Sequence, residues 1–530
     1  MNVENNAQTM NVDVAYVTGA LKTAYDVIVC GAGSSGSVVA RRLAENPGIQ
    51  VLLLEAGGSD EVPSVMEAAR WAENLGGPTD WSFAAEPSPD LNGRSLPMSV
   101  GKVLGGGSSI NVMIWSRGHR NDWDHFAEEA GDPAWSYTSI LDIHRRIEDW
   151  RGRPDPRRGV GGLLAVEQFP DPHPAARAMV DAATSLGIPA FDSPNGAMME
   201  AEQGCALSDI RVKDGRRLSV FDTYVRPVLD RPNLTVLTEA LVHRVIFAGR
   251  RAAGVEVVLQ GQLHRIDAVQ QVVLSAGAIN TPRMLMHSGI GDGEELKRLG
   301  IPLVQHLPGV GRNLQDHTCF CTVWEYGEPI APRGNGSGAI LYGKSDSGAI
   351  SPDILMCQAE FPYCSPEAAR RGLPSHGWSM VAGLAQPKSR GRVQLRSSSP
   401  HDPPTITTNA LSHPDDMTVA RVAVELSREI GTAKAFAGVS VREAIPGRLD
   451  AAEMDGFIRD SAMPFFHLSC TARMGRDPLS VVSGDLKVYG VSNLTIADAS
   501  VMPRITSGNT MASCVIIGER AAEILLQELS

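Results

Sequence analysis

Residues 24–58 read AYDVIVCGAGSSGSVVARRLAENPGIQVLLLEAGG and decide the class of fold. A short apolar run at 27–30 is typical of a buried parallel strand and leads into Gly31-x-Gly33-x-x-Gly36. A stretch with helical spacing follows and precedes a second apolar run, which ends at Glu55, 19 residues after Gly36. This order of strand, glycine-rich turn, helix, strand and acid predicts a Rossmann-type α/β unit that binds a dinucleotide.

Each residue of this unit has a physical task. Gly31 permits the tight turn, Gly33 lets backbone N–H groups approach a pyrophosphate, and Gly36 allows the helix and strand to pack closely. The helix N-terminus supplies partial positive charge for the phosphates, and Glu55 accepts hydrogen bonds from ribose hydroxyls. The unit alone does not separate NAD from FAD or name a reaction, and a plain βαβ turn without a ligand is the alternative.

Composition excludes several classes of protein. With 530 residues, 43% hydrophobic and 20% charged, we expect two or three globular domains. The net charge of −12 argues against nucleic acid or an anionic membrane as partner, and no apolar run approaches the length of a membrane span. Eight scattered cysteines without a C-x-x-C pair fit neither a disulfide scaffold nor a zinc site, so we expect no metal and a cytoplasmic location. Residues 1–23 carry no basic residue before Lys22, which predicts a loose N-terminal extension rather than a signal peptide.

Further glycine-rich and polar blocks follow along the chain. Residues 101–118 contain GGGSSIN at 105–111, residues 277–291 follow a strand-like run at 272–275, and residues 307–317 read LPGVGRNLQDH. The C-terminal part carries HLSCT at 467–471, DASVMP at 498–503 and SGNT at 507–510. Together these blocks resemble the glucose–methanol–choline (GMC) family of FAD-dependent oxidoreductases over about residues 24–527. The resemblance is nearest to the bacterial alcohol dehydrogenase and oxidase branch, which includes choline dehydrogenase-like and pyridoxine 4-oxidase-like proteins.

The resemblance implies a chain that folds discontinuously. The FAD-binding domain would be assembled from residues 24–157, 205–317 and 478–530. A substrate-binding domain on an antiparallel sheet would come from residues 158–204 and 318–477.

The resemblance also implies the site. His467 matches the catalytic histidine, and Asn509 matches its partner, whose amide would donate a hydrogen bond to the substrate oxygen. Ile110 stands where some relatives tether FAD through a histidine, which implies noncovalent FAD. The alternatives are a core histidine for His467, a turn or flavin-supporting residue for Asn509, and a plain strand residue for Val242. The expected cofactor-binding residues are Gly31, Gly33, Gly36, Glu55, Gly105, Ser109, Asn111, Val112, Val242, Asp498, Ala499, Asn509 and Thr510.

The implied reaction is oxidation of a primary alcohol to an aldehyde, by hydride transfer to flavin N5 with His467 as general base. The sequence leaves open whether oxygen or another acceptor takes the electrons, and it leaves the oligomeric state open. A hydroxynitrile lyase-type enzyme, a nicotinamide-dependent dehydrogenase and a noncatalytic binding module are the alternatives. Aromatic residues make up 5% of the chain, and the sequence identifies no aromatic cage for a quaternary ammonium. We expect a neutral primary alcohol, benzylic or heteroaromatic.

Two departures from the family pattern bear on the substrate. The family usually reads His-Pro-Val-Gly-Thr where this chain has His467-Leu468-Ser469-Cys470-Thr471. It also usually has proline where Ser513 stands. Because proline fixes φ, we expect the loop geometry around His467 and Asn509 to differ.

Overall fold

The predicted βαβ unit forms the centre of the first sheet. The computed structural model describes residues 21–529, so nearly all of the expected extension at 1–23 lies outside the described residues. Strand β1 (Ala24–Cys30) runs parallel to β2 (Val51–Leu54) on one side and to β13 (Gln262–Leu274) on the other, and α1 (Gly36–Ala44) connects β1 to β2. Residues 27–30 are fully buried, as expected of a strand covered on both faces. The Rossmann-type prediction is confirmed.

Distant segments complete this sheet, whose order is β10-β2-β1-β13-β12-β11. The C-terminal half of β13 pairs parallel with β1, whereas its N-terminal half pairs antiparallel with β12. Strand β25 joins β13 from more than 200 residues further along the chain, so the sheet is built discontinuously. The added strands are β10 (Leu234–Leu237), β11 (Leu241–Ala248), β12 (Arg251–Leu259) and β25 (Leu494–Ile496).

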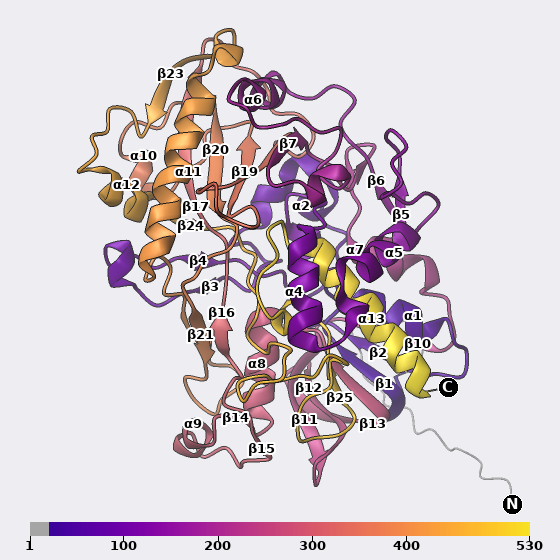
Figure 1. Ribbon diagram of the computed structural model, residues 1–530. Coiled ribbons are helices and arrows are strands. Elements are labelled where there is room, and N and C mark those ends of the chain that lie inside the picture. Colours follow the sequence, from indigo (N-terminus) through magenta and orange to yellow (C-terminus); the bar gives the residue numbers. More distant parts are fainter. Residues whose placement is uncertain (1–20, 530) are drawn as a thin grey trace, which may run out of the picture.

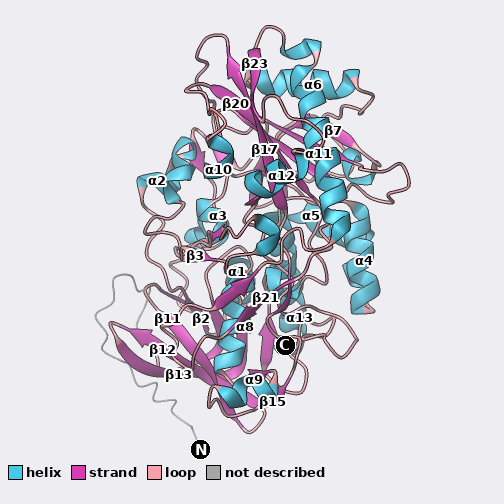
Figure 2. Ribbon diagram, turned by 90° about the vertical axis from the view of Figure 1, so that its left-hand side faces the viewer, coloured by secondary structure: helices cyan, strands magenta, loops and turns pink. Residues whose placement is uncertain are grey.

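The second large sheet is antiparallel throughout, and Figure 2 shows it at the opposite end of the molecule from β11–β13. This confirms the antiparallel sheet that the resemblance implied. The domain boundaries remain a prediction. Strand β7 spans the predicted boundary between residues 204 and 205. In spatial order the strands are β23 (Ser440–Ile445), β17 (Thr318–Tyr326), β20 (Gly377–Leu384), β19 (Ile354–Ala359), β18 (Ala339–Gly343) and β7 (Gly204–Leu207), with β24 (Met463–Pro464) paired to β17.

Helices cover one face of the second sheet. Helices α6 (Pro174–Ser185) and α11 (Pro414–Thr432) lie across it in Figure 1, and their apolar residues pack on side chains such as Trp324 and Met356. Residues alternate between the faces of a strand. Cys357 and its neighbours in register therefore point to the other face, away from these helices.

The C-terminal helix packs against the first helix of the chain. Helix α13 (Met511–Leu529) lies beside α1 in Figure 1. Ser35 donates a hydrogen bond to the carbonyl oxygen of Cys514 at 2.7 Å, and Arg42 is paired with Glu519 at 3.0 Å. This packing places the first turns of α13 next to the glycine-rich turn, and Asn509 comes just before the helix. Within residues 21–529, every helix is too short or too polar to cross a bilayer.

Candidate functional site

The glycine-rich turn after β1 is packed tightly against neighbouring backbone. Gly31 adopts φ +107°, and an ideal Cβ there would lie 2.4 Å from the carbonyl oxygen of Ser275. An ideal Cβ on Gly36 would lie 1.9 Å from the carbonyl oxygen of Gly31, so glycine lets α1 begin this close to β1. Gly33 differs, because an ideal Cβ there would meet only the Cα of Gly106, at 3.9 Å. Gly33 therefore borders open space in the wall of a cavity.

Glu55 stands directly after β2 and is buried. Its carboxylate accepts hydrogen bonds from the N–H groups of Ala32, at 3.0 Å, and Gly57, at 2.9 Å. Burial raises the pKa of the Glu55 carboxyl to about 7, and these N–H groups oppose the rise. The side chain is thus fixed at the strand end, in the cavity wall.

The triple-glycine segment divides into residues that hold the loop and residues that face the cavity. The N–H of Gly105 donates to the carbonyl oxygen of Ala32 at 2.8 Å, and the hydroxyl of Ser109 donates to the backbone carbonyl of Leu104 at 2.6 Å. Their neighbours Gly106, Gly107 and Ile110 line the cavity. Gly105 and Ser109 therefore shape this wall from behind.

Two distant side chains clamp the turn at Asn111 and Val112. Arg217 Nη1 donates to the carbonyl oxygen of Asn111 at 2.6 Å and to its Oδ1 at 2.8 Å. Asn335 Nδ2 donates to the carbonyl oxygen of Val112 at 2.5 Å. Met113 follows with φ +61°, a strained conformation for a residue other than glycine. Neither Arg217 nor Asn335 was predicted from the sequence, because neither lies in one of the family motifs.

Asp498 fixes the start of α8 (Gly277–His287). Its carboxylate accepts hydrogen bonds from the N–H of Gly277 at 2.9 Å, the hydroxyl of Thr281 at 2.5 Å and the N–H of Ser500 at 2.8 Å. Burial raises the pKa of the Asp498 carboxyl. The carboxylate is therefore engaged by the chain itself, while the segment of Asp498 and Ala499 forms cavity wall.

His467 and Asn509 meet at the cavity although they are 42 residues apart. Asn509 Nδ2 lies 3.2 Å from His467 Nε2. The His467 ring stacks on Phe465 with centroids 5.4 Å apart, and its backbone N–H donates to Asp316 Oδ1 at 2.7 Å. Burial lowers the pKa of His467 well below its ordinary 6.5, and neighbouring His317 lowers it further. A neutral imidazole beside an amide can supply a proton acceptor and a hydrogen-bond donor to one small molecule.

The residues that depart from the family pattern lie beside this pair. Cys470, where the pattern has glycine, adopts φ +74°, and Phe466 adopts φ +61°. Both residues are therefore strained in the left-handed region. Ser513, where the pattern has proline, lies in the first turn of α13 and shares a hydrogen bond with the hydroxyl of Thr506 at 3.2 Å.

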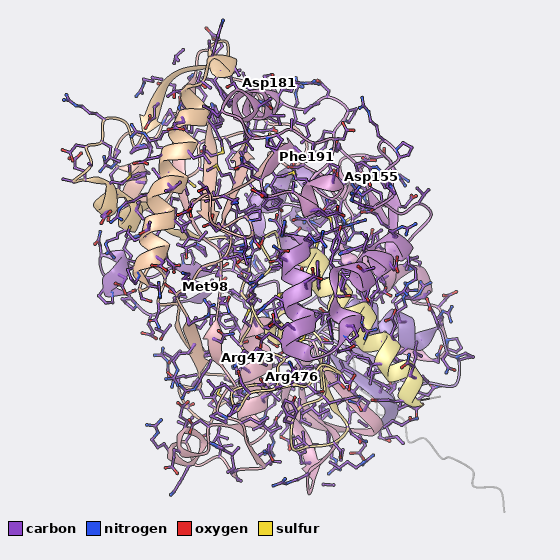
Figure 3. The ribbon with its side chains drawn as sticks, viewed as in Figure 1. Met98, Asp155, Asp181, Phe191, Arg473 and Arg476 are labelled. Carbon is purple, nitrogen blue, oxygen red and sulfur yellow. The ribbon has the colours of Figure 1, made fainter. Side chains whose placement is uncertain are left out.

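The block that carries His467 is fastened to helix α4 (Arg120–Ala130). Arg476 Nη2 donates to the carbonyl oxygen of Glu128 at 2.9 Å, and Arg473 lies 3.9 Å from the carboxylate of Glu129. Figure 3 shows both arginines at the end of α4. The C-terminal end of a helix favours cations, so this contact helps to hold the block in place.

One cavity of about 350 Å³ runs from the glycine-rich turn to His467 and has the size of small-molecule and cofactor pockets. Of the site residues predicted from the sequence, all of which the structure describes, Gly36, Gly105 and Ser109 do not line this cavity. It brings together His467 and the other predicted site residues, namely Gly31, Gly33, Glu55, Asn111, Val112, Val242, Asp498, Ala499, Asn509 and Thr510.

Aromatic and small apolar side chains line the end of the cavity beside His467. Three distant segments supply the aromatic residues, and the second sheet supplies the small ones. Of the described residues that line the cavity, the carboxylates are Glu55 and Asp498, and both accept hydrogen bonds from the chain. The low aromatic content of the whole chain gave no indication that aromatic side chains gather at this end of the cavity. The residues are Trp71, Phe361, Tyr363, Phe465, Phe466, Cys319, Cys357, Ala359 and Val381.

Sequence profiles of GMC oxidoreductases match residues 25–319 and 387–518. The chain belongs to the GMC oxidoreductase family. It is 37% identical to the mitochondrial choline dehydrogenase of Mus musculus, over 95% of this chain and 90% of that protein. It is 36% identical to the oxygen-dependent choline dehydrogenase of Brucella suis biovar 1 (strain 1330), over 94% and 95%. The crystal structure of pyridoxine 4-oxidase from Mesorbium loti superposes with a TM-score of 0.90 at 33% identity, over 94% of this chain and 98% of that one.

The residues present fit the FAD that GMC oxidoreductases bind. Helix α1 has no acidic residue in its first turn, so its N-terminus suits a pyrophosphate. The open space at Gly33 allows a close approach of phosphate to backbone, and Glu55 stands at the strand end where a ribose would lie. As a GMC oxidoreductase, the chain is an FAD-dependent enzyme that acts on CH–OH groups.

Proposed function

We propose that this GMC oxidoreductase oxidises a small, neutral primary alcohol to the aldehyde, with His467 as the base that takes the hydroxyl proton. The observation that supports this most directly is the pairing of His467 Nε2 and Asn509 Nδ2, 3.2 Å apart at the apolar end of the cavity. When bound along the wall that contains Gly33 and Glu55, FAD, held without a covalent link, would supply the acceptor for the hydride of the carbinol carbon.

Each residue of the pair has one task in this proposal. The alcohol O–H bond breaks as its proton moves to His467 Nε2. Asn509 donates an amide N–H to the same oxygen and stabilises the negative charge that develops there. The aromatic walls exclude water and hold the carbinol carbon in place. A positioned general base contributes about 10²–10⁴-fold to the rate.

The cavity favours a neutral aromatic alcohol. Trp71, Phe361 and Tyr363 supply aromatic rings. The ring centroid of Phe361 lies 6.5 Å from that of Trp71 and 6.3 Å from that of Tyr363. No carboxylate among the described lining residues is free to pair with a cation. Choline is the second candidate, because aromatic faces attract quaternary ammonium groups and several relatives are choline dehydrogenases.

The test is a panel of benzyl alcohol, pyridylmethanols, pyridoxine and choline, read in parallel for hydrogen peroxide and for reduction of an artificial dye. We expect aldehyde formation from the aromatic alcohols, and the readout that responds identifies the electron acceptor. His467→Ala should keep its flavin and lose at least about 100-fold in rate, whereas His264→Ala, on β13, should match the parent enzyme. A preference for choline would replace the substrate assignment. Cleavage of a cyanohydrin without any acceptor, and no alcohol oxidation, would replace oxidation by the lyase alternative.

A further inference from the structure

A second histidine lies directly behind His467. His317 ends the LPGVGRNLQDH block and comes just before β17, and its side chain is fully buried. Its Nδ1 lies 2.9 Å from Nδ1 of His467, and the two rings are nearly perpendicular at 86°. The family resemblance implied no task for this histidine.

The contacts of His467 determine where its proton lies. An amide NH₂ group can only donate, so Asn509 Nδ2 requires a lone pair on His467 Nε2. The neutral ring then carries its proton on Nδ1. A nitrogen–nitrogen contact of 2.9 Å needs one hydrogen between the atoms, so His467 Nδ1–H donates to His317 Nδ1. In this tautomer the lone pair lies on Nε2, the nitrogen beside Asn509, so Nε2 is the atom that can take up a proton.

We propose that His317 is a positioning residue, which keeps the proton of His467 on Nδ1 so that Nε2 remains the base. This assignment rests on the proposed function. When the alcohol O–H bond breaks and an N–H bond forms at Nε2, His317 still accepts the Nδ1–H bond of the resulting imidazolium. The arrangement resembles the way in which other catalytic bases are oriented by a third group.

The surroundings of the two rings contain few charges. Asp122 on α4 faces His317, but its carboxylate already binds the N–H and hydroxyl of Ser507 and lies 3.6 Å from Arg504. Asp316 binds the backbone N–H of His467, and burial raises the pKa of its carboxyl to about 7. Burial lowers the pKa of His317 to about 4, so His317 is a neutral acceptor at working pH.

The test compares two replacements of His317 in the holoenzyme. His317→Gln retains an acceptor for the Nδ1–H of His467, whereas His317→Leu removes it. His144→Leu, which replaces another fully buried histidine, controls for the loss of a buried ring. Flavin reduction by an alcohol is followed without oxygen across pH, together with flavin content, absorption spectrum and substrate affinity.

We expect His317→Leu to keep its flavin and substrate affinity and to lose about 100-fold in reduction rate at neutral pH. Its remaining rate should rise about tenfold per pH unit, because hydroxide then replaces the misplaced base. His317→Gln should stay within about tenfold of the parent enzyme, with a flat profile above neutral pH. If His317→Leu does not fold, His317→Gln provides the test. A flavin reduction rate of His317→Gln that rises about tenfold per pH unit would overturn the assignment.

The outcomes separate this assignment from the proposed function. A His317→Leu enzyme that is reduced at the parent rate would remove His317 from the mechanism and leave His467 in place. If no alcohol reduces the parent enzyme, the proposed function itself fails.

Discussion

Replacing Gly33 with alanine should weaken FAD binding without weakening the fold. An ideal Cβ at Gly33 meets only Gly106 Cα, at 3.9 Å, which is ordinary van der Waals contact. We therefore expect the free energy of unfolding of the apoprotein to change by less than about 0.5 kcal/mol. In the holoenzyme the same methyl group occupies the space through which a pyrophosphate approaches the turn. Overpacking of this kind costs about 1–3 kcal/mol, which corresponds to a rise in Kd of about 5- to 150-fold.

Gly36→Ala provides the contrast. An ideal Cβ there lies 1.9 Å from the carbonyl oxygen of Gly31, so α1 must move by about 1.1 Å to restore even a 3.0 Å contact. The apoprotein should then lose about 1–3 kcal/mol of unfolding free energy. Gly456→Ala, on an exposed position of α12 (Met454–Ser461) with nothing within 4 Å of the added carbon, is the control.

Both quantities are measured on apoprotein, by denaturant unfolding and by titration with FAD followed through flavin fluorescence. If Gly33→Ala binds FAD with the parent Kd, no phosphate approaches this turn and the placement of the cofactor is wrong. If it unfolds as readily as Gly36→Ala, the space at Gly33 is not open.

The remaining predictions concern the flavin link at Ile110, the clamp residue Asn335 and the buried carboxyl of Glu360. Because Ile110 offers no atom for a covalent link, acid precipitation should release all flavin to the supernatant, and flavin in the pellet would contradict noncovalent binding. Asn335→Leu leaves the Val112 carbonyl and the Ser337 N–H without their partner, so denaturant unfolding should show a loss of about 2–4 kcal/mol; an unchanged stability would mean that the clamp contributes nothing. Burial raises the pKa of Glu360 to about 7, so the folded state binds a proton that the unfolded state releases above about pH 4.5. The free energy of unfolding of Glu360→Gln should therefore match that of the parent near pH 4.5 and exceed it by up to about 3 kcal/mol at pH 7. A difference in unfolding free energy that stays constant between these pH values would refute the raised pKa of Glu360.

The βαβ unit was predictable because its determinants are local. Strand, turn and helix follow one another within residues 24–58, and the closest contact at Gly36 is with Gly31, five residues earlier in the chain. The crowding of Gly31 against Ser275 arises only after folding. The antiparallel sheet was predictable only through the family resemblance, since its strands come from segments up to about 260 residues apart. No local pattern specifies which of them pair.

The supporting residues of the site were not predictable from local patterns. Arg217 reaches Asn111 across 106 residues, and His317 reaches His467 across 150. Each works through contacts that exist only after folding. The sequence carried a partial signal for His317, because this histidine ends the LPGVGRNLQDH block that belongs to the family pattern. The glycine position of the family pattern at Cys470 also carried a usable signal, because a left-handed φ was to be expected there.

The most direct test of the central claim is anaerobic mixing of the purified enzyme with an aromatic primary alcohol while the flavin absorbance is recorded. We predict that the yellow colour bleaches in one phase, with one aldehyde formed per flavin, and that His467→Ala bleaches at least about 100-fold more slowly with the same flavin content. A flavin that stays oxidised with every alcohol, or that bleaches equally fast without His467, would contradict the account.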